Sequence, residues 1–313
     1  MDSHAKSSRL PLIEFNEKSL TPGTTSWKST SDSVREALES YGCFVLAHHE
    51  LGPDLQNRAF DFTKDLFRLP YETKSRHVSQ LPGFGYGANF PVMPLFEYFG
   101  VEGCETPEGA KNFTNLMWPD DGHNKFCETI HSYSKLLWEL NNAVVKMVAS
   151  SYNLEKCYDR LTQSSIYMTR LMRYHAPGES KSHIGIIPHR DKSFMAVIGT
   201  NEVEGLQIET RDGNWIEYEP SPGKFVVIVG EALTAWSNGR IYCPLHKVIA
   251  RGAKEKYSIG IFSFVGGTLQ VPDELVDEEN PLRFRAFSNL EFLNYCKEGG
   301  ATMKGAIQAY CGI

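Results

Sequence analysis

The chain has 313 residues, of which 41 % are hydrophobic, 12 % aromatic and 22 % charged, and its formal net charge is −6. This composition supports a sizeable buried core and argues against wholesale disorder. A mildly acidic chain is a poor match for proteins that bind nucleic acid or a membrane surface through a basic patch. No apolar run reaches the roughly 18–20 residues of a membrane span. We therefore expect neither a nucleic-acid nor a membrane partner.

Seven cysteines are scattered along the chain, and no two form a Cys-x-x-Cys pair. The pattern predicts reduced thiols rather than a disulfide framework or a zinc ribbon. Residues 1–6 also lack the apolar stretch of a secretory signal. We expect a cytoplasmic protein that is a monomer.

The first half of the chain is predicted to be rich in helix. Apolar residues at helical spacing predict helices over residues 31–41, 53–69 and 124–152. Ser31 is the expected N-cap of the first of these helices. Gly42 ends that helix, and the apolar run 43–47 predicts a buried strand. Residues 81–99 are rich in Gly and Pro and predict an irregular loop.

From about Ile166 the pattern changes to short runs of Val, Ile, Phe and Tyr between turn signals. These runs predict strands over residues 165–174, 194–199, 206–209, 215–218, 225–229, 246–250 and 257–265. Short strands at regular spacing favour a double-sheet jelly roll. A helical tail over 289–308, broken at Gly299-Gly300, follows them. The predicted fold is α+β, with an α-rich N-terminal supporting region over 1–160 and a double-stranded β-helix (jelly-roll) core with C-terminal helices over 161–313.

Two histidines and an aspartate at predicted strand edges form a candidate metal site. His189 and Asp191 are two residues apart, so in an extended segment their side chains point to the same side. His246 opens a later strand. Two imidazoles and one carboxylate on one face of a metal leave other positions open, which suits non-haem Fe(II) and O2 chemistry. A structural role for a lone His-x-Asp is an equally simple interpretation.

Lys256 and Ser258 form a second candidate pair, ten residues beyond His246. On a strand they share a side, so a cation and a hydroxyl can together bind a carboxylate. An Fe(II) oxygenase that activates O2 with an organic acid needs such a pair. For Lys256 alone, a surface lysine at the start of a strand is the simpler interpretation.

The order His189-x-Asp191, His246 and basic-x-Ser258 resembles the plant-type 2-oxoglutarate- and Fe(II)-dependent dioxygenases. Further segments that match the family are Tyr41-Gly42-Cys43-Phe44, Leu206-Gln207 and Ser237-Asn238-Gly239-Arg240. The segments 271–277 and 310–313 resemble one branch of the family in plant specialised metabolism. That branch includes the glucosinolate side-chain oxygenases and the steroidal glycoalkaloid hydroxylases.

The resemblance implies a role for each matching residue. His189, Asp191 and His246 would ligate Fe(II), and Lys256, Ser258 and Tyr174 would bind the distal carboxylate of the cosubstrate 2-oxoglutarate. O2 is the other cosubstrate, and ascorbate is the expected iron reductant. Turnover releases succinate and CO2 and forms a ferryl-oxo intermediate that oxidises a small specialised metabolite. Hydroxylation is the expected outcome, with desaturation, demethylation and ring closure open to the same intermediate.

Two positions depart from the family pattern. Lys256 stands where the family usually has Arg, and Met172 stands where its Asn-x-Tyr motif has Asn. Lys offers a point charge on a flexible stem in place of a bidentate fork, so the grip on a carboxylate is looser. Two alternatives therefore stay open. One is an Fe(II) oxidase that uses another reductant, and the other is a non-catalytic small-molecule-binding protein on the same scaffold.

The substrate is expected to be an apolar or amphipathic small molecule, because the candidate pocket residues are mainly Phe and Met rather than a cluster of Arg. These candidates are Phe84, Tyr86, Met168, Met172, Phe194 and Phe264. Each could instead dock a loop or fill the core.

Overall fold

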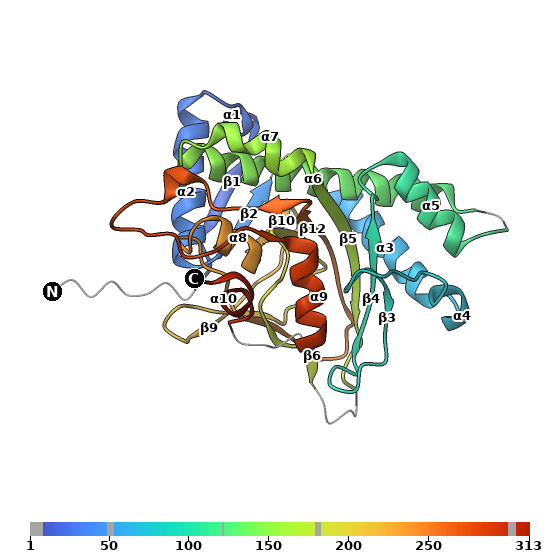
Figure 1. Cartoon of the computed structure of the whole chain (residues 1–313). Helices are drawn as coiled ribbons and strands as arrows, with labels where there is room; N and C mark the ends of the chain where they lie inside the picture. The colour runs from blue at the N-terminus through green and yellow to red at the C-terminus, as the bar shows by residue number, and fades with distance from the viewer. Residues whose placement is uncertain (1–8, 49–52, 121, 179–182, 300–304) are drawn as a thin grey trace.

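The computed structural model describes residues 9–48, 53–120, 122–178, 183–299 and 305–313 (Figure 1). Its larger sheet has eight strands in the order β1-β2-β10-β7-β12-β5-β4-β3, and a smaller sheet has the order β6-β11-β8-β9. The larger sheet consists of β1 (Leu12–Phe15), β2 (Cys43–His48), β3 (Gly85–Gly87), β4 (Phe96–Glu102), β5 (Ser165–Tyr174), β7 (Met195–Thr200), β10 (Lys224–Val229) and β12 (Lys256–Val265). The smaller sheet consists of β6 (Ile184–His189), β8 (Leu206–Glu209), β9 (Trp215–Glu217) and β11 (His246–Ile249). A separate pair joins β13 (Thr268–Leu269) to β14 (Phe287–Ser288).

Helices surround the sheets. Those before the jelly roll are α1 (Glu17–Leu20), α2 (Thr25–Ser40), α3 (Pro53–Arg68), α4 (Tyr71–Lys74), α5 (Pro107–Met117), α6 (Asn124–Ser151) and α7 (Glu155–Gln163). Those within and after it are α8 (Glu231–Trp236), a 3-10 turn at Asp273–Leu275, α9 (Asn289–Gly299) and α10 (Ala306–Cys311). The two sheets and their helical cover confirm the predicted α+β jelly roll.

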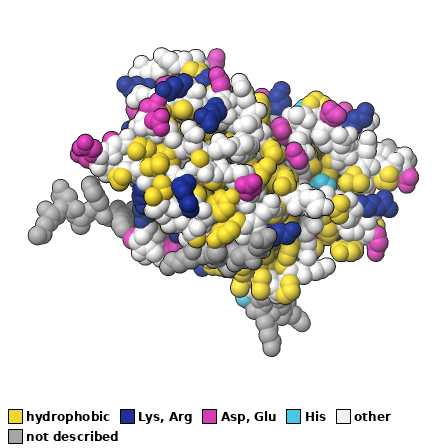
Figure 2. Space-filling model, in the orientation of Figure 1, with side chains coloured by type: hydrophobic (Ala, Val, Ile, Leu, Met, Phe, Trp, Pro, Cys, Tyr) yellow, Lys and Arg dark blue, Asp and Glu magenta, His cyan; other side chains and the backbone are white. Residues whose placement is uncertain are grey.

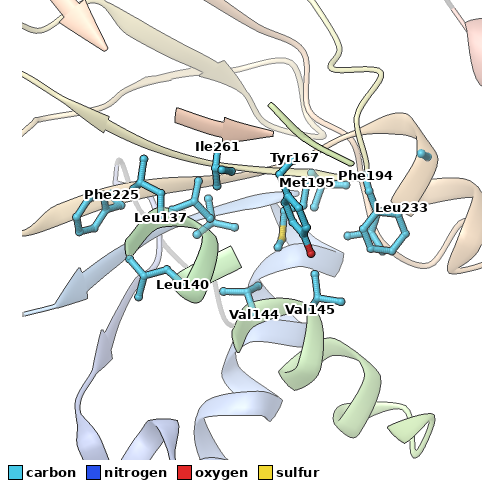
Figure 3. Packing of buried hydrophobic residues seen from close by; sticks show 14 of the residues in the cluster. Leu137, Leu140, Val144, Val145, Tyr167, Phe194, Met195, Phe225, Leu233 and Ile261 are labelled. Carbon is cyan, nitrogen blue, oxygen red and sulfur yellow. The ribbon is translucent and has the colours of Figure 1, made fainter. Parts of the chain in front are cut away.

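The long helix α6 covers one face of the larger sheet (Figure 3). Leu137, Leu140 and Val144 recur at helical spacing on one side of α6, and they are buried in one cluster with residues such as Met195 and Ile261 of the central strands. The other face of these strands belongs to a second cluster, which includes residues of both sheets. The central strands are therefore buried on both faces, and the face away from α6 is the one that looks toward the smaller sheet.

Some predicted boundaries were wrong for identifiable reasons. Helix α2 begins six residues before Ser31, because Thr24 is its N-cap and accepts a hydrogen bond from the Trp27 amide at 3.0 Å. Ser31 lies inside the helix and donates to the Trp27 carbonyl at 2.8 Å. The segment predicted as an irregular loop contains β3 and β4, which complete one edge of the larger sheet.

The predicted division at residue 160 falls inside α7, and four strands from before it (β1 to β4) join the larger sheet. The division of the chain into regions 1–160 and 161–313 stays a prediction from the sequence. All seven cysteines are free thiols. Over the described ranges, no helix combines the length and apolarity needed to cross a bilayer. On the face shown in Figure 2, acidic and basic side chains are interspersed among patches of hydrophobic ones.

Candidate metal centre and adjoining cavities

The smaller sheet brings the two candidate histidines together. His246 at the start of β11 is the direct cross-strand partner of His189 at the end of β6, and their ring centroids are 4.2 Å apart. Strand β6 was not predicted from the sequence. Asp191 follows β6, and its backbone carbonyl accepts a hydrogen bond from the Glu231 amide at 2.8 Å, which ties it to the start of α8. The three side chains thus converge although they come from three different local structures.

Hydrogen bonds to backbone carbonyls orient both imidazoles. Nδ1 of His189 lies 2.9 Å from the Ile187 carbonyl oxygen, and Nδ1 of His246 lies 3.3 Å from that of Pro244. A carbonyl only accepts, so Nδ1 carries a proton in each ring, which leaves Nε2 as the nitrogen that can ligate a metal. The Nε2 atoms lie 3.6 Å and 3.8 Å from Oδ1 of Asp191. A backbone carbonyl that accepts from Nδ1, the ring nitrogen that faces away from the metal, is typical of metal-ligating histidines.

The electrostatics of the three groups suit a bound cation. Burial and the neighbouring His189 lower the pKa of His246 to about 4, so its imidazole is neutral at neutral pH. Burial alone would raise the pKa of Asp191, but the two imidazoles and Arg170 outweigh it and lower the pKa to about 2. Oδ2 of Asp191 is buried and has no hydrogen-bond partner.

Three acceptor atoms therefore meet at one point, with one ligand atom from each residue within 4.8 Å of the others. Converging lone pairs with no proton between them repel one another unless a cation occupies the space. Two imidazole nitrogens and a carboxylate oxygen with open positions beside them are the donor set that non-haem Fe(II) prefers. The residues present fit that metal.

A small cavity of about 40 Å³ adjoins the metal centre between the two sheets. Tyr174, Met172, Lys256 and Ser258 line it together with the three candidate ligands. Cross-strand pairing explains the grouping, because Lys256 lies opposite Tyr174 and Ser258 lies opposite Met172. The predicted carboxylate-binding residues are thus brought together beside the metal centre. Burial raises the pKa of Tyr174, so its hydroxyl stays protonated and can donate.

Lys256 is a buried cation without a carboxylate partner among the described residues. Its Nζ donates to the Val203 carbonyl at 2.7 Å. Burial lowers the pKa of Lys256 to about 7, although Glu204 and Glu217 act in the opposite direction. Thr200, which sequence reasoning missed, lines the same cavity with a buried hydroxyl oxygen that has no hydrogen-bond partner. These polar groups match a small carboxylate.

A larger cavity of about 540 Å³ opens on the other side of the metal centre, between β4, β5, β12 and α9. Its volume is within the range of small-molecule sites. Its apolar lining residues are Phe90, Met93, Phe96, Tyr98, Met168, Phe262, Phe264 and Leu293. Of the predicted pocket residues, Met168 and Phe264 line this cavity, whereas Met172 lines the small cavity.

Three other pocket candidates lie elsewhere. Tyr86 contacts Phe99 on the opposite face of β4 from the cavity, and its hydroxyl donates to Glu97 at 2.6 Å. Phe194 packs against Trp236 in the cluster that contains α6. Phe84 lies against Phe264, with ring centroids 5.6 Å apart, and does not line the cavity. The structure thus places these three side chains outside both cavities, because residue type does not reveal which face of a strand or loop a ring occupies.

Arg170 lines both cavities and was not predicted as a site residue. A signal was available, because Met168, Arg170, Met172 and Tyr174 alternate along one strand and so share one face. The inward position of Met168 and Met172 places Arg170 inward as well.

Comparisons with known proteins agree with this geometry. Residues 165–264 match the model of the 2OG-Fe(II) oxygenase superfamily, and residues 10–120 match that of the N-terminal region of non-haem dioxygenases in morphine synthesis. The probable 2-oxoglutarate-dependent dioxygenase AOP1 of Arabidopsis thaliana is 36 % identical over 97 % of this chain and 96 % of its own length. The 2-oxoglutarate-dependent dioxygenase AOP3 of the same plant is 27 % identical over 98 % of both chains.

Solved structures show the same relationship. The rice dioxygenase for auxin oxidation superposes with a TM-score of 0.80 at 28 % identity, over 97 % of this chain and all of that one. The 2-oxoglutarate complex of the Arabidopsis thaliana dioxygenase for auxin oxidation 1 gives 0.78 at 28 % identity, over 87 % of this chain. The chain therefore belongs to the 2OG-Fe(II) oxygenase superfamily. It is a 2-oxoglutarate- and Fe(II)-dependent dioxygenase.

Proposed function

We propose that the protein oxidises, and most simply hydroxylates, an apolar or amphipathic small molecule held in the larger cavity. The observation that carries this proposal is the convergence of His189, Asp191 and His246 beside the small cavity, with His189 and Asp191 also lining the larger one. The family relationship and the small-molecule activity named for the auxin-oxidising relatives support it.

In this proposal His189, Asp191 and His246 hold the iron. Lys256, Ser258 and Tyr174 bind the distal carboxylate of 2-oxoglutarate, since these three residues line the small cavity beside the metal centre. When bound, iron and 2-oxoglutarate together supply the oxidising power, with O2 as the oxidant and ascorbate as a candidate reductant of the iron. The chain's own contribution is to orient the imidazoles, exclude water behind Phe262 and Phe264, and place the substrate next to the metal.

Asp191 also bears on the outcome of the reaction. Its carboxylate occupies a ligand position that a small residue would leave open to halide, so the donor set favours transfer of oxygen over halogenation. Desaturation, demethylation and ring closure need the same site and differ only in which substrate carbons are presented to it. Monomeric state and cytoplasmic location stay predictions from the sequence.

Titration of the anaerobic Fe(II)-loaded protein with 2-oxoglutarate tests the proposal, because a chelated 2-oxo acid gives a visible charge-transfer band. We expect the band in the wild type and a tighter titration in Lys256→Arg, whose fork suits a carboxylate better. A band only in Lys256→Arg would favour an Fe(II) oxidase that uses another reductant. Iron binding without a band in either protein contradicts the cosubstrate assignment, and absence of iron binding favours a non-catalytic binding protein.

A further inference from the structure

Arg170 is a cation inside the site that forms no ion pair with any described carboxylate, although its charge helps to lower the pKa of Asp191. It lies on the inward face of β5 and lines both cavities. Its Nε is buried and makes no hydrogen bond, and none of the described carboxylates forms an ion pair with its guanidinium. Arg173, three residues along the same strand, instead pairs with Glu97 and Glu255 on the outer face. Of these two arginines, only Arg170 lacks an ion pair with a described carboxylate.

The surrounding strands make room for this guanidinium. Arg170 lies opposite Gly100 on β4 and opposite Gly260 on β12, so neither neighbouring strand places a side chain beside it. A Cβ at Gly260 would lie 2.9 Å from Cγ1 of Ile198, which is too close for any larger residue. The Arg170 guanidinium carbon lies 4.2 Å from the centroid of the Tyr98 ring. Stacking on a ring face holds a guanidinium without using its N–H groups, which remain available to a ligand.

An unpaired arginine in this position is costly for the free protein. Arg170 is half-buried, and its Nε is buried without a hydrogen-bond partner among the described residues, which is unfavourable for a polar atom. Aromatic rings surround it, with Phe96 and Phe262 also near the guanidinium at 5.8 Å and 6.0 Å from their ring centroids. The larger cavity is also lined by Arg190, Lys192 and Lys297, of which Lys192 pairs with Glu231 and Arg190 lies 5.8 Å from the centroid of the Tyr242 ring. A ligand that has one anionic group on an otherwise apolar body matches these walls and this cation together.

The distal carboxylate of 2-oxoglutarate is not placed to be the anionic partner of Arg170. Its proposed partner Lys256 is paired with Tyr174, four residues along β5 from Arg170. At about 3.3 Å per residue, the two positions are about 13 Å apart along the strand, too far to share one carboxylate. Arg170 also lines the larger cavity, whereas Lys256 lines only the small one.

We propose that Arg170 binds the carboxylate of the substrate, and that the substrate is therefore an apolar carboxylic acid. The ion pair anchors the acid end, and the apolar body lies against Phe96, Phe262 and Phe264 beside the metal centre. The inference rests on the proposed function in assigning the larger cavity to the substrate. It narrows the apolar or amphipathic substrate expected from the sequence to an acid.

The test uses two pairs of matched probes, cinnamate against cinnamamide and 4-phenylbutyrate against 4-phenylbutyramide. Calorimetry measures their binding to the full-length protein, with and without Fe(II) and 2-oxoglutarate. The variants are Arg170→Gln and Arg170→Lys, and Arg173→Gln is the control that removes a positive charge from the outer face of the same strand. The charge-transfer titration measures 2-oxoglutarate affinity, and a melting curve measures stability.

We expect the wild type and Arg173→Gln to bind at least one carboxylate about tenfold or more tightly than its amide. Arg170→Gln should lose this preference, and Arg170→Lys should keep part of it. Arg170→Gln should also keep 2-oxoglutarate affinity within about twofold. The melting curve checks that the variant, which loses the stacking contact with Tyr98, is still folded.

Three results would overturn the inference. They are a carboxylate preference that survives in Arg170→Gln, no preference for either carboxylate in the wild type, and a large loss of 2-oxoglutarate affinity in Arg170→Gln. The last result would assign Arg170 to the cosubstrate. Failure of the proposed function is separate, since it appears as a missing charge-transfer band in the wild type, whereas the probe calorimetry does not depend on that band.

Discussion

Lys256 and Tyr174 are direct cross-strand partners on β12 and β5, and both side chains line the small cavity beside the metal centre. The lysine is buried, and its Nζ is held by the Val203 carbonyl rather than by a carboxylate. This pairing places one cation and one phenol where a carboxylate can bind. Burial lowers the pKa of Lys256, so the charge on the lysine depends on pH.

The first prediction concerns the pH dependence of 2-oxoglutarate binding. The pKa of Lys256 is lowered to about 7 in the free protein, chiefly by burial, and only the charged amine attracts a carboxylate. Affinity should therefore be nearly constant well below pH 7 and fall as pH rises above 7, by roughly tenfold or more by about pH 8.5. Charge-transfer titrations across this range measure it.

Lys256→Arg is the matched control, because a guanidinium does not titrate in this range. Its affinity for 2-oxoglutarate should stay nearly constant over the same pH range. A wild-type affinity as flat as that of the variant would show that Lys256 does not bind the cosubstrate as a titrating cation.

The second prediction concerns the iron. Asp191→Ala should weaken Fe(II) binding by at least about 100-fold, because loss of a ligand costs more than the 10–100-fold typical of an outer partner. A melting curve of the metal-free variant checks that it is folded. Anaerobic competition with an Fe(II) chelator measures affinity. Asp61→Ala, at an exposed position paired with Lys64, is the control that should bind iron like the wild type.

The third prediction compares two tyrosines. Tyr174→Phe should weaken 2-oxoglutarate binding several-fold with little change in stability, because its hydroxyl makes only weak contacts within the protein, such as the long one of 3.5 Å to Met172 Sδ. Tyr86→Phe should lower the free energy of unfolding by about 1 kcal/mol through loss of the bond to Glu97, and leave 2-oxoglutarate binding unchanged. Charge-transfer titration and urea unfolding separate the two effects. Equal effects of both substitutions on 2-oxoglutarate would contradict the placement of Tyr86 outside the cavities.

The fourth prediction concerns the helical cover of the larger sheet. Leu137 on α6 is fully buried against the sheet, so Leu137→Ala should lower the free energy of unfolding by about 2–5 kcal/mol through the cavity that it leaves. Leu12→Ala, at a position that is 53 % exposed, should cost about 0.5 kcal/mol or less. Denaturant unfolding measures both. A small effect at Leu137 would mean that α6 does not support the site-bearing strands.

The sequence by itself indicated the fold class and the three candidate metal ligands. It also singled out Lys256 and Ser258 as a pair expected to bind a carboxylate. The strands that carry Lys256, Ser258 and His246 have strong local signals, namely β-branched and aromatic runs between turn residues. The motif His189-x-Asp191 is local as well, since two residues in an extended segment share a side wherever the strand lies. These features depend on residue order over a few positions, so a sequence alone displays them.

Only the tertiary structure decided which rings line the larger cavity and which cation forms no ion pair with a described carboxylate. Tyr86 and Phe264 are both aromatic, yet Tyr86 lies on the face of β4 away from the larger cavity, and Phe264 on β12 lines that cavity. Arg170 and Arg173 look alike in the sequence, and only cross-strand neighbours show that one is ion-paired and the other is flanked by glycines. Such differences arise from contacts between residues far apart in the chain, which local patterns do not encode.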